Sequence, residues 1–307
     1  MLENVLTTCG LQKRYGKQLA VKNVDMHIGR GDIYGFVGEN GSGKTTLIRM
    51  ITGLIFPDQG SFRLFGTENT DRQIGAARSR IGAIVETPSI YLNMSAVDNL
   101  RQQCILLKQD ENKIPAVLAD VGLEDLLGNR KRAGDFSLGM RQRLGIAMAL
   151  LGDPEFLILD EPMNGLDPAG IVEIRELILR LNRERSITFL ISSHILTELA
   201  LVANKYGIIS HGELIKEITA EELEAECRPL TVIEVNDPEA LWELLLQEFP
   251  AQDLSHHAGG VGVAGVLQLN PLLTKIMAAG LEILSVNCHK FSIEDYYLSL
   301  LGGGRHA

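Results

Sequence analysis

The stretch Asp32–Thr46 reads DIYGFVGENGSGKTT, and it decides the fold. Its first six residues form a short β-rich run, and a helical pattern begins near Lys44. Between them, Gly38–Thr45 fits the pattern G-x-x-x-x-G-K-[ST]. The glycines let successive backbone N–H groups turn toward one anion, and the helix N-terminus adds partial positive charge. Strand, turn and helix in this order predict a phosphate-binding loop.

Each residue of this loop is a candidate contact for a nucleotide. Lys44 is expected to neutralise the β- and γ-phosphates, the Thr45 hydroxyl to ligate Mg²⁺, and Thr46 to reach the α-phosphate. The predicted ATP-binding set is Gly38, Glu39, Asn40, Gly41, Ser42, Gly43, Lys44, Thr45 and Thr46. The alternative, a glycine-rich turn that opens a helix by chance, does not explain why strand, glycines, lysine and threonine coincide.

Two acidic residues follow an apolar run later in the chain. Phe156–Leu159 is continuously apolar, as expected of a strand buried on both faces, and Asp160 and Glu161 come directly after it. In open α/β sheets, ligands bind at the carboxyl ends of the strands. Asp160 is therefore predicted to hold Mg²⁺, and Glu161 to polarise the attacking water as general base. A solvated strand end before Pro162 is the alternative interpretation.

Further apolar runs alternate with helical periodicity over the first ~215 residues. The predicted strands, besides Asp32–Val37 and Phe156–Leu159, are Val5–Tyr15, Ile81–Val85, Ile187–Ile191 and Tyr206–Ile209, with a clear helix at Ala169–Asn182. Strands that alternate with helices imply an α/β fold with a largely parallel sheet.

The pattern changes after about Ala220. Strands are predicted at Thr231–Val235, Val261–Leu269 and Leu281–Val286, and helices at Asp237–Phe249, Pro271–Ala279 and Ser292–Leu301. Asp237 is a plausible N-cap, with proline following at the first turn. These elements predict a compact α+β appendage of roughly ferredoxin-like order.

The composition restricts the classes of partner. The chain has 307 residues and a formal net charge of −10, which disfavours binding to nucleic acid. Its four cysteines have no metal-ligand or CxxC spacing and are interpreted as free thiols in a reducing cytosol. No signal peptide is expected at the N-terminus. No segment approaches ~18 uninterrupted apolar residues, so any membrane path must come from another chain.

Four further motifs resemble those of ABC ATPases. Phe136–Arg143, FSLGMRQR, resembles the signature motif of that family, commonly L-S-G-G-Q. Met163–Asp167 resembles the family's D-loop, and Ser192–His194 resembles the segment that carries its switch histidine. Tyr15, in the sequence KRYG, stands where the family stacks adenine on an aromatic ring. All four lie in the family's order, within about the first 215 residues.

The resemblance implies a P-loop NTPase fold. An ABC ATPase domain is expected over residues 1–220, with a mostly parallel sheet core and a helical subdomain at about residues 87–150. A small α+β C-terminal domain is expected over residues 221–307.

The resemblance also implies roles for single residues. Ser137 and Gly139 would address the γ-phosphate of ATP held by a partner subunit, and His194 would contact the γ-phosphate beside Glu161. Asp167 would bridge subunits, and Tyr15 would stack on adenine. Each has a simpler interpretation: Ser137 caps a helix, His194 is structural, Asp167 is a loop acid and Tyr15 is packed.

Two departures from the family pattern bear on activity. The signature reads S-L-G-M-R, so Leu138 replaces one glycine, while Ser137 and Gly139 are kept. Glu86 stands where most relatives have a glutamine that touches Mg²⁺ and senses the membrane subunit. A carboxylate can ligate Mg²⁺, but it adds negative charge near the γ-phosphate; an exposed acid is the alternative. This loop and the terminal SIEDYYLSL resemble ATP-binding subunits of bacitracin- and lantibiotic-immunity exporters.

The resemblance implies a head-to-tail homodimer with two composite ATP sites, driven open and closed by Mg-ATP binding and hydrolysis. It implies a multi-span permease as a second partner and a cytoplasmic location, peripheral on the inner face of the cell membrane. The apolar residues of the segment 86–107 (Tyr91, Leu92, Met94, Val97, Leu100) are expected to grip a cytoplasmic helix of the permease, unless they belong to the core. Export of an antimicrobial peptide, an antibiotic or a lipid-like substrate is the transport function expected from the resemblance.

Two rival functions remain at this point. A soluble ABC protein that acts on ribosomes usually carries two cassettes, and one that acts in DNA repair carries a long coiled coil, whereas this chain has one phosphate loop and no heptad run. The second rival is a non-hydrolysing sensor gated by ATP. Such a protein need not keep both Glu161 and His194, so the presence of both residues argues against it.

Overall fold

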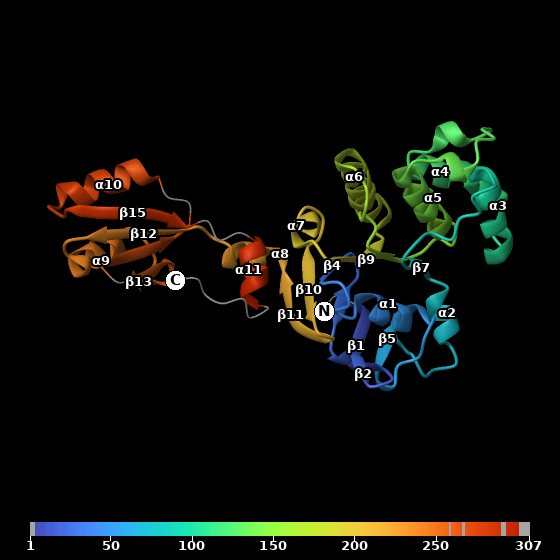
Figure 1. Cartoon of the computed structure of the whole chain (residues 1–307), viewed down its shortest axis with the longest axis horizontal. Coiled ribbons are helices and arrows are strands. Elements are labelled where there is room, and N and C mark those ends of the chain that lie inside the picture. The colour runs from blue at the N-terminus through green and yellow to red at the C-terminus, as the bar shows by residue number, and fades with distance from the viewer. Residues whose placement is uncertain (1–3, 258, 266–267, 290–292, 301–307) are drawn as a thin grey trace. The chain divides into compact units, whose positions relative to one another are not determined.

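The computed structural model describes residues 4–257, 259–265, 268–289 and 293–300. The chain divides into two compact units, Met1–Ala220 and Glu221–Ala307 (Figure 1). The first contains the phosphate loop and the acidic pair. None of the helices in the described ranges is both long and apolar enough to cross a membrane.

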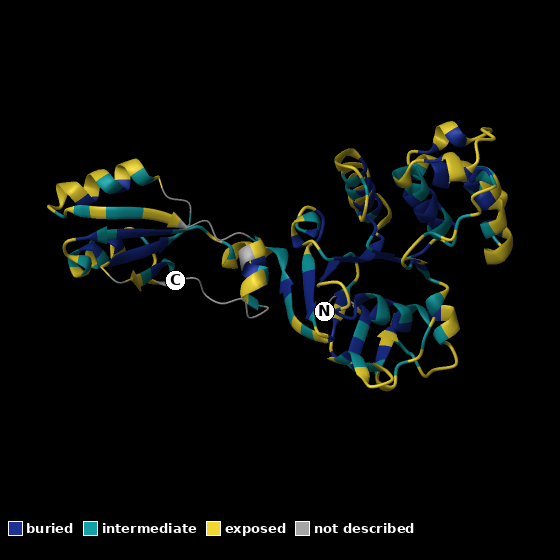
Figure 2. Cartoon of the chain, in the orientation of Figure 1, coloured by how far each residue is buried: buried dark blue, intermediate teal, exposed yellow. Residues whose placement is uncertain are grey.

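A six-stranded sheet forms the centre of the first unit. Its strand order is β11-β10-β4-β9-β8-β7, parallel except for β11. The bounds are β4 Ile33–Val37, β7 Ile81–Ile84, β8 Phe156–Asp160, β9 Thr188–Ser193, β10 Lys205–Ser210 and β11 Glu213–Thr219. Strands β4, β8 and β9 are buried along their whole length (Figure 2), which explains the apolar runs in their sequences. The predicted parallel α/β core is confirmed.

A second, antiparallel sheet was predicted only in its first strand. It contains β1 Asn4–Tyr15, β2 Gln18–Val24, β3 His27–Gly29, β5 Gln59–Leu64 and β6 Thr67–Glu68. Helix α1, Lys44–Thr52, contributes Leu47, Ile48 and Ile51 to one core cluster that also includes residues of both sheets. The short helix α2 spans Ile74–Arg78.

Helices make up most of the segment between β7 and β8. They are α3 Ala96–Leu107, α4 Ile114–Asp120 and α5 Leu138–Leu150, with 3₁₀ turns at Glu111–Lys113, Glu124–Leu126 and Ala133–Asp135. Gly145 of α5 is a required glycine, because an added Cβ would lie 2.6 Å from Pro88 in the loop after β7. Helices α6, Pro168–Arg185, and α7, Leu196–Leu199, flank β9 in the sequence.

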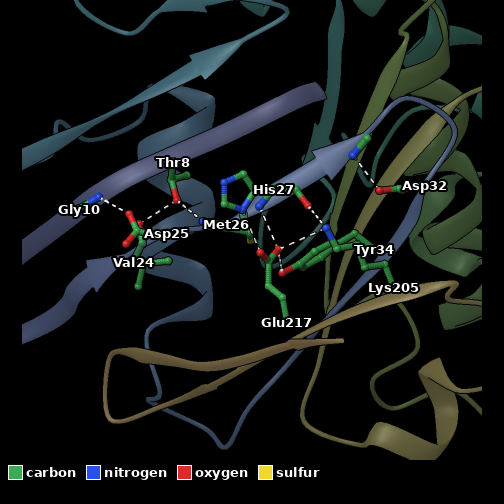
Figure 3. A network of polar contacts seen from close by, with 11 residues as sticks. Thr8, Gly10, Val24, Asp25, Met26, His27, Asp32, Tyr34, Lys205 and Glu217 are labelled. Atoms are coloured by element: carbon green, nitrogen blue, oxygen red, sulfur yellow. Dashed lines mark hydrogen bonds and ion pairs between the residues drawn. The ribbon is translucent and has the colours of Figure 1, made fainter. Parts of the chain in front are cut away.

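Glu217 on β11 joins the two sheets of the first unit (Figure 3). Its carboxylate accepts hydrogen bonds from the His27 backbone N–H and the Tyr34 hydroxyl, both at 2.9 Å, and Lys205 Nζ lies 3.7 Å away. Burial, and then the neighbouring Glu217 charge, raise the pKa of Tyr34 well above its usual value. Tyr34 also lies directly over Gly207, where a Cβ would come within 2.1 Å of its hydroxyl.

Replacing Glu217 with alanine is expected to lower the free energy of unfolding by about 1–3 kcal/mol, since the buried Tyr34 hydroxyl then has no acceptor. Urea denaturation of the purified chain measures the change. Adding Tyr34→Phe to the Glu217→Ala variant removes the orphaned hydroxyl, so the double variant should lose less than the sum of the two single losses. Strictly additive losses would contradict this account.

The second unit has the strand and helix order of a ferredoxin-like domain. Its elements are α8 Ala220–Glu226, β12 Leu230–Val235, α9 Pro238–Leu246, a 3₁₀ turn Ala251–Asp253, β13 Leu254–His257, β14 Gly260–Ala264, α10 Leu269–Ala278, β15 Ile283–His289 and α11 Ile293–Leu300. The antiparallel sheet has the order β13-β14-β12-β15.

The order of the elements of this unit follows the prediction, with differences in detail. Asp237 caps α9, accepting a hydrogen bond from Ala240 N at 3.1 Å, as expected. The predicted strand Val261–Leu269 is too long, since β14 ends at Ala264 and Leu269 begins α10, while residues 266 and 267 lie outside the described residues. Strand β13 was not predicted. Of the predicted last helix, Ser292 and Leu301 lie outside the described residues.

Candidate active site

The phosphate loop follows β4 and is packed too closely for side chains at two positions. Gly38 N donates a hydrogen bond to Ser193 O at 3.2 Å, and a Cβ on Gly38 would lie 2.4 Å from Ile209 O. Gly43 caps α1 with φ of 111°, and a Cβ there would lie 2.5 Å from Ala20 O. Sterics therefore require glycine at both positions, and at Gly43 the backbone conformation requires it as well.

Lys44 is buried, and its ammonium group points back into the loop. Nζ donates hydrogen bonds to Gly38 O at 2.6 Å and Glu39 O at 3.2 Å, and it lies 3.3 Å from Glu161 Oε1. Within the described ranges, Ser42 Oγ is buried without a hydrogen-bond partner. A buried ammonium beside an orphaned hydroxyl fits an anion such as a nucleotide phosphate.

Asp160 is held between two hydroxyl groups from different segments. Thr45 Oγ1 on α1 donates to Asp160 Oδ2 at 2.8 Å, and Ser192 Oγ on β9 donates to Asp160 Oδ1 at 2.5 Å. Asp160 is 1% exposed. Among the described residues no group of three or more His, Cys, Asp and Glu could hold a metal. A site with one carboxylate and one hydroxyl suits Mg²⁺, which keeps waters and takes further oxygens from a substrate's phosphates.

Glu161 lies between Lys44 and His194. His194 Nδ1 donates to Glu161 Oε2 at 2.8 Å, while the other carboxylate oxygen faces Lys44. Glu161 has φ of 49°, which is strained for a non-glycine residue, and its backbone N–H donates to Ser192 Oγ at 2.9 Å. The hydrogen bond and the ion pair fix the carboxylate, as general base chemistry requires.

Ser137 and Asp167 both cap helices, which was the simpler interpretation of Ser137 but was not predicted for Asp167. Ser137 Oγ accepts from Met140 N at the start of α5, and Asp167 Oδ1 accepts from Gly170 N at the start of α6. Ser137 is exposed, so its side chain is open to a second molecule. Leu138, the departure from the signature pattern, packs over Gly165 of the D-loop, where a Cβ would lie 3.4 Å from its Cδ2.

Tyr15 ends β1, with 47% of its surface exposed, and Lys13 Nζ lies 5.9 Å from its ring centroid. The ring is therefore available for stacking, and its predicted role with adenine stays a prediction. Thr46 is partly buried on α1, and Asn40 and Gly41 are exposed in the loop.

Glu86 contacts an arginine that the sequence analysis missed. Its carboxylate pairs with Arg49 Nη2 at 2.5 Å, and its φ is 64°. Its role as a metal ligand stays a prediction. The contact of Ser192 with Asp160 was also missed, although the neighbouring positions of two strand ends carry the signal.

Known proteins resemble this chain over both units. A family model described as ABC transporter matches residues 21–164. The bacitracin transport ATP-binding protein BcrA of Bacillus licheniformis is 42% identical over 99% of each chain. The lantibiotic transport ATP-binding protein SrtF of Streptococcus pyogenes is 42% identical over 67% of this chain and 87% of its own.

Solved structures of ABC transporter ATP-binding proteins also resemble this chain. CbiO1 from Clostridium perfringens, described as part of the ABC transporter complex cbiONQ, superposes with a TM-score of 0.66 at 26% identity, covering 81% of this chain and 96% of its own. The ADP conformation of another ABC transporter's ATP-binding cassette gives a TM-score of 0.64 at 26% identity, covering 72% and 93%.

Proposed function

This chain belongs to the ABC transporter family as an ATP-hydrolysing subunit, and we propose that Mg-ATP closes a homodimer of it to drive a separate membrane permease. The observation that carries the proposal is the Glu161 carboxylate, held between Lys44 and His194 beside the Thr45–Asp160 pair. A chain that only senses ATP has no need of a base fixed in this way.

The residues of the site divide the work of hydrolysis. Backbone N–H groups of the loop and Lys44 bind the phosphates, while Thr45 and Asp160 would hold Mg²⁺. The metal, when bound, neutralises charge on the phosphate oxygens. Glu161 takes the proton of the attacking water, and His194 and Lys44 keep its carboxylate in one orientation.

The proposed dimer is supported by the exposure of the signature-motif serine, Ser137, in the single chain. Cassettes of this family act as dimers with membrane permeases. Ser137 stands exposed at the N-terminus of α5, where partial positive charge favours an anion that a second copy would bring. Each ATP-binding site is then formed by residues of two chains, so ATP binding favours the closed dimer.

The permease is proposed to dock at the start of the helical segment. Tyr91 and Leu92 are 51% and 56% exposed, and a groove of about 850 Å³ next to them includes Met94 and Val97. Leu100 is buried, so its predicted place on this surface is wrong and it belongs to the core. The docking surface is therefore narrower than the segment 86–107.

The cargo is proposed to be a peptide antibiotic of the bacitracin or lantibiotic type. The similarity to the bacitracin transport ATP-binding protein spans both units, which supports the same class of cargo. The chain then works on the cytoplasmic face of the cell membrane, where its permease lies. The net charge of −10 supports this over a nucleic-acid partner.

Expression in a sensitive bacterium, together with a candidate permease, tests the proposal. Wild-type chain is expected to raise the bacitracin concentration that stops growth severalfold, because an ATP-driven exporter lowers the amount of antibiotic at its site of action. The Glu161→Gln variant, at equal abundance, should give no protection. Equal protection by both would contradict an ATP-driven pump.

A further inference from the structure

Arg49 and Glu86 form an ion pair at the edge of the site. Arg49 Nη2 donates to Glu86 Oε1 at 2.5 Å, and both side chains are partly exposed. Arg49 comes four residues after Thr45 on α1, so the two side chains share one face of the helix, about one turn apart. Arg49 therefore connects Glu86 to α1, the helix that presents Thr45 to Asp160.

The loop that carries Glu86 is fixed on both sides. Val85 packs against the core cluster of the two sheets, and Pro88 packs against Gly145 of α5 with no room for a Cβ. Glu86 itself has φ of 64°, a strained conformation for a non-glycine residue. The loop has little freedom to carry the carboxylate away from α1.

An unpaired carboxylate in this place would weaken binding of a polyanion. Like charges repel, and at physiological salt the repulsion between exposed groups extends over about 8 Å. A cation that pairs with Glu86 offsets this effect without adding a phosphate contact of its own. Arg49 is in contact with Glu86 and has that charge.

We propose that Arg49 is a positioning residue that neutralises Glu86 and holds its carboxylate against α1, so that the site tolerates an acid there while it binds Mg-ATP. The proposal rests on the proposed function, in which this loop binds Mg-ATP. It explains how a chain with glutamate at position 86 keeps a working phosphate site.

Calorimetric titration with the non-hydrolysable analogue AMP-PNP and Mg²⁺ tests this. Arg49→Met is expected to raise the Kd about two- to fivefold, the range measured for exposed ion pairs. Glu86→Gln should bind at least as tightly as wild type, and Arg49→Met combined with Glu86→Gln should bind as tightly as Glu86→Gln alone. The loss caused by Arg49→Met should shrink at high salt, because screening weakens the repulsion.

Arg101→Met is the matched control. Arg101 is also a half-exposed arginine that pairs with carboxylates, those of Asp98 and Glu111, but it lies on α3. Its replacement should leave the Kd unchanged. Wild-type affinity in Arg49→Met, or a double variant as weak as Arg49→Met, would overturn the role of Arg49 alone. A wild-type chain that failed to bind the analogue would overturn the proposed function as well.

Discussion

Replacing Glu161 with glutamine is expected to lower the rate of ATP hydrolysis by about 10²–10⁴-fold, the range that a positioned general base contributes. The amide has nearly the shape of the carboxylate, so it can still accept from one neighbour, Lys44 or His194. It cannot take a proton from water. The fold and the affinity for ATP should therefore survive while hydrolysis stops.

The same variant should accumulate as a dimer when Mg-ATP is present, since the nucleotide that joins the two chains is no longer cleaved. Light scattering after size-exclusion chromatography, with Mg-ATP in the running buffer, measures the mass. Glu176→Gln, an exposed acid on α6, is the control and should behave as wild type. A Glu161→Gln chain that stayed monomeric at saturating Mg-ATP would refute the dimer mechanism.

Replacing Ser137 with aspartate, which introduces a negative charge, is expected to abolish dimer formation and to reduce the rate of ATP hydrolysis by about 100-fold or more. The loss is large because the variant places a negative charge opposite the partner's triphosphate. In the wild type, the Ser137 hydroxyl and the N-terminus of α5 would stabilise charge at that place. Aspartate caps helices as well as serine does, so Ser137→Asp should leave α5 intact.

Ser137→Asn separates charge from capping, because asparagine is also a good N-cap and is neutral. Both variants should unfold at the same urea concentration as wild type and bind ATP to their own phosphate loop with unchanged affinity. Only Ser137→Asp should fail to dimerise in the Glu161→Gln background. Similar dimers from the Asp and Asn variants would show that Ser137 does not face a phosphate.

The sequence predicted the parts of the fold that rest on local patterns. Continuous apolar runs marked β4, β8 and β9 because these strands are buried on both faces. The antiparallel strands β2, β3, β5 and β6 were missed. They are short or only partly buried, and their partners lie elsewhere in the chain, so no local period identifies them.

In the candidate site, too, the features that depend on local sequence were predicted, and those that depend on distant contacts were not. Glycine, lysine and threonine at fixed spacing identify a phosphate loop because its chemistry is local. The partners of Glu86 and Asp160 are not local: Arg49 is 37 residues from Glu86, and Ser192 is 32 residues from Asp160. Side-chain contacts at such separations depend on how strands and helices meet, and a single sequence does not contain that information. The strained backbone of Glu161 likewise depends on its surroundings.

The position of β4 in the central sheet has a consequence for biosynthesis. This early strand pairs with β9 and β10, which the ribosome produces more than 150 residues later, and Gly38 packs against Ile209. The nascent chain therefore cannot form its ATP site until Ser210 has left the exit tunnel, and truncated translation products that end earlier should not retain nucleotide. ATP then stabilises only molecules in which these strands are complete, because a ligand stabilises only the form that binds it.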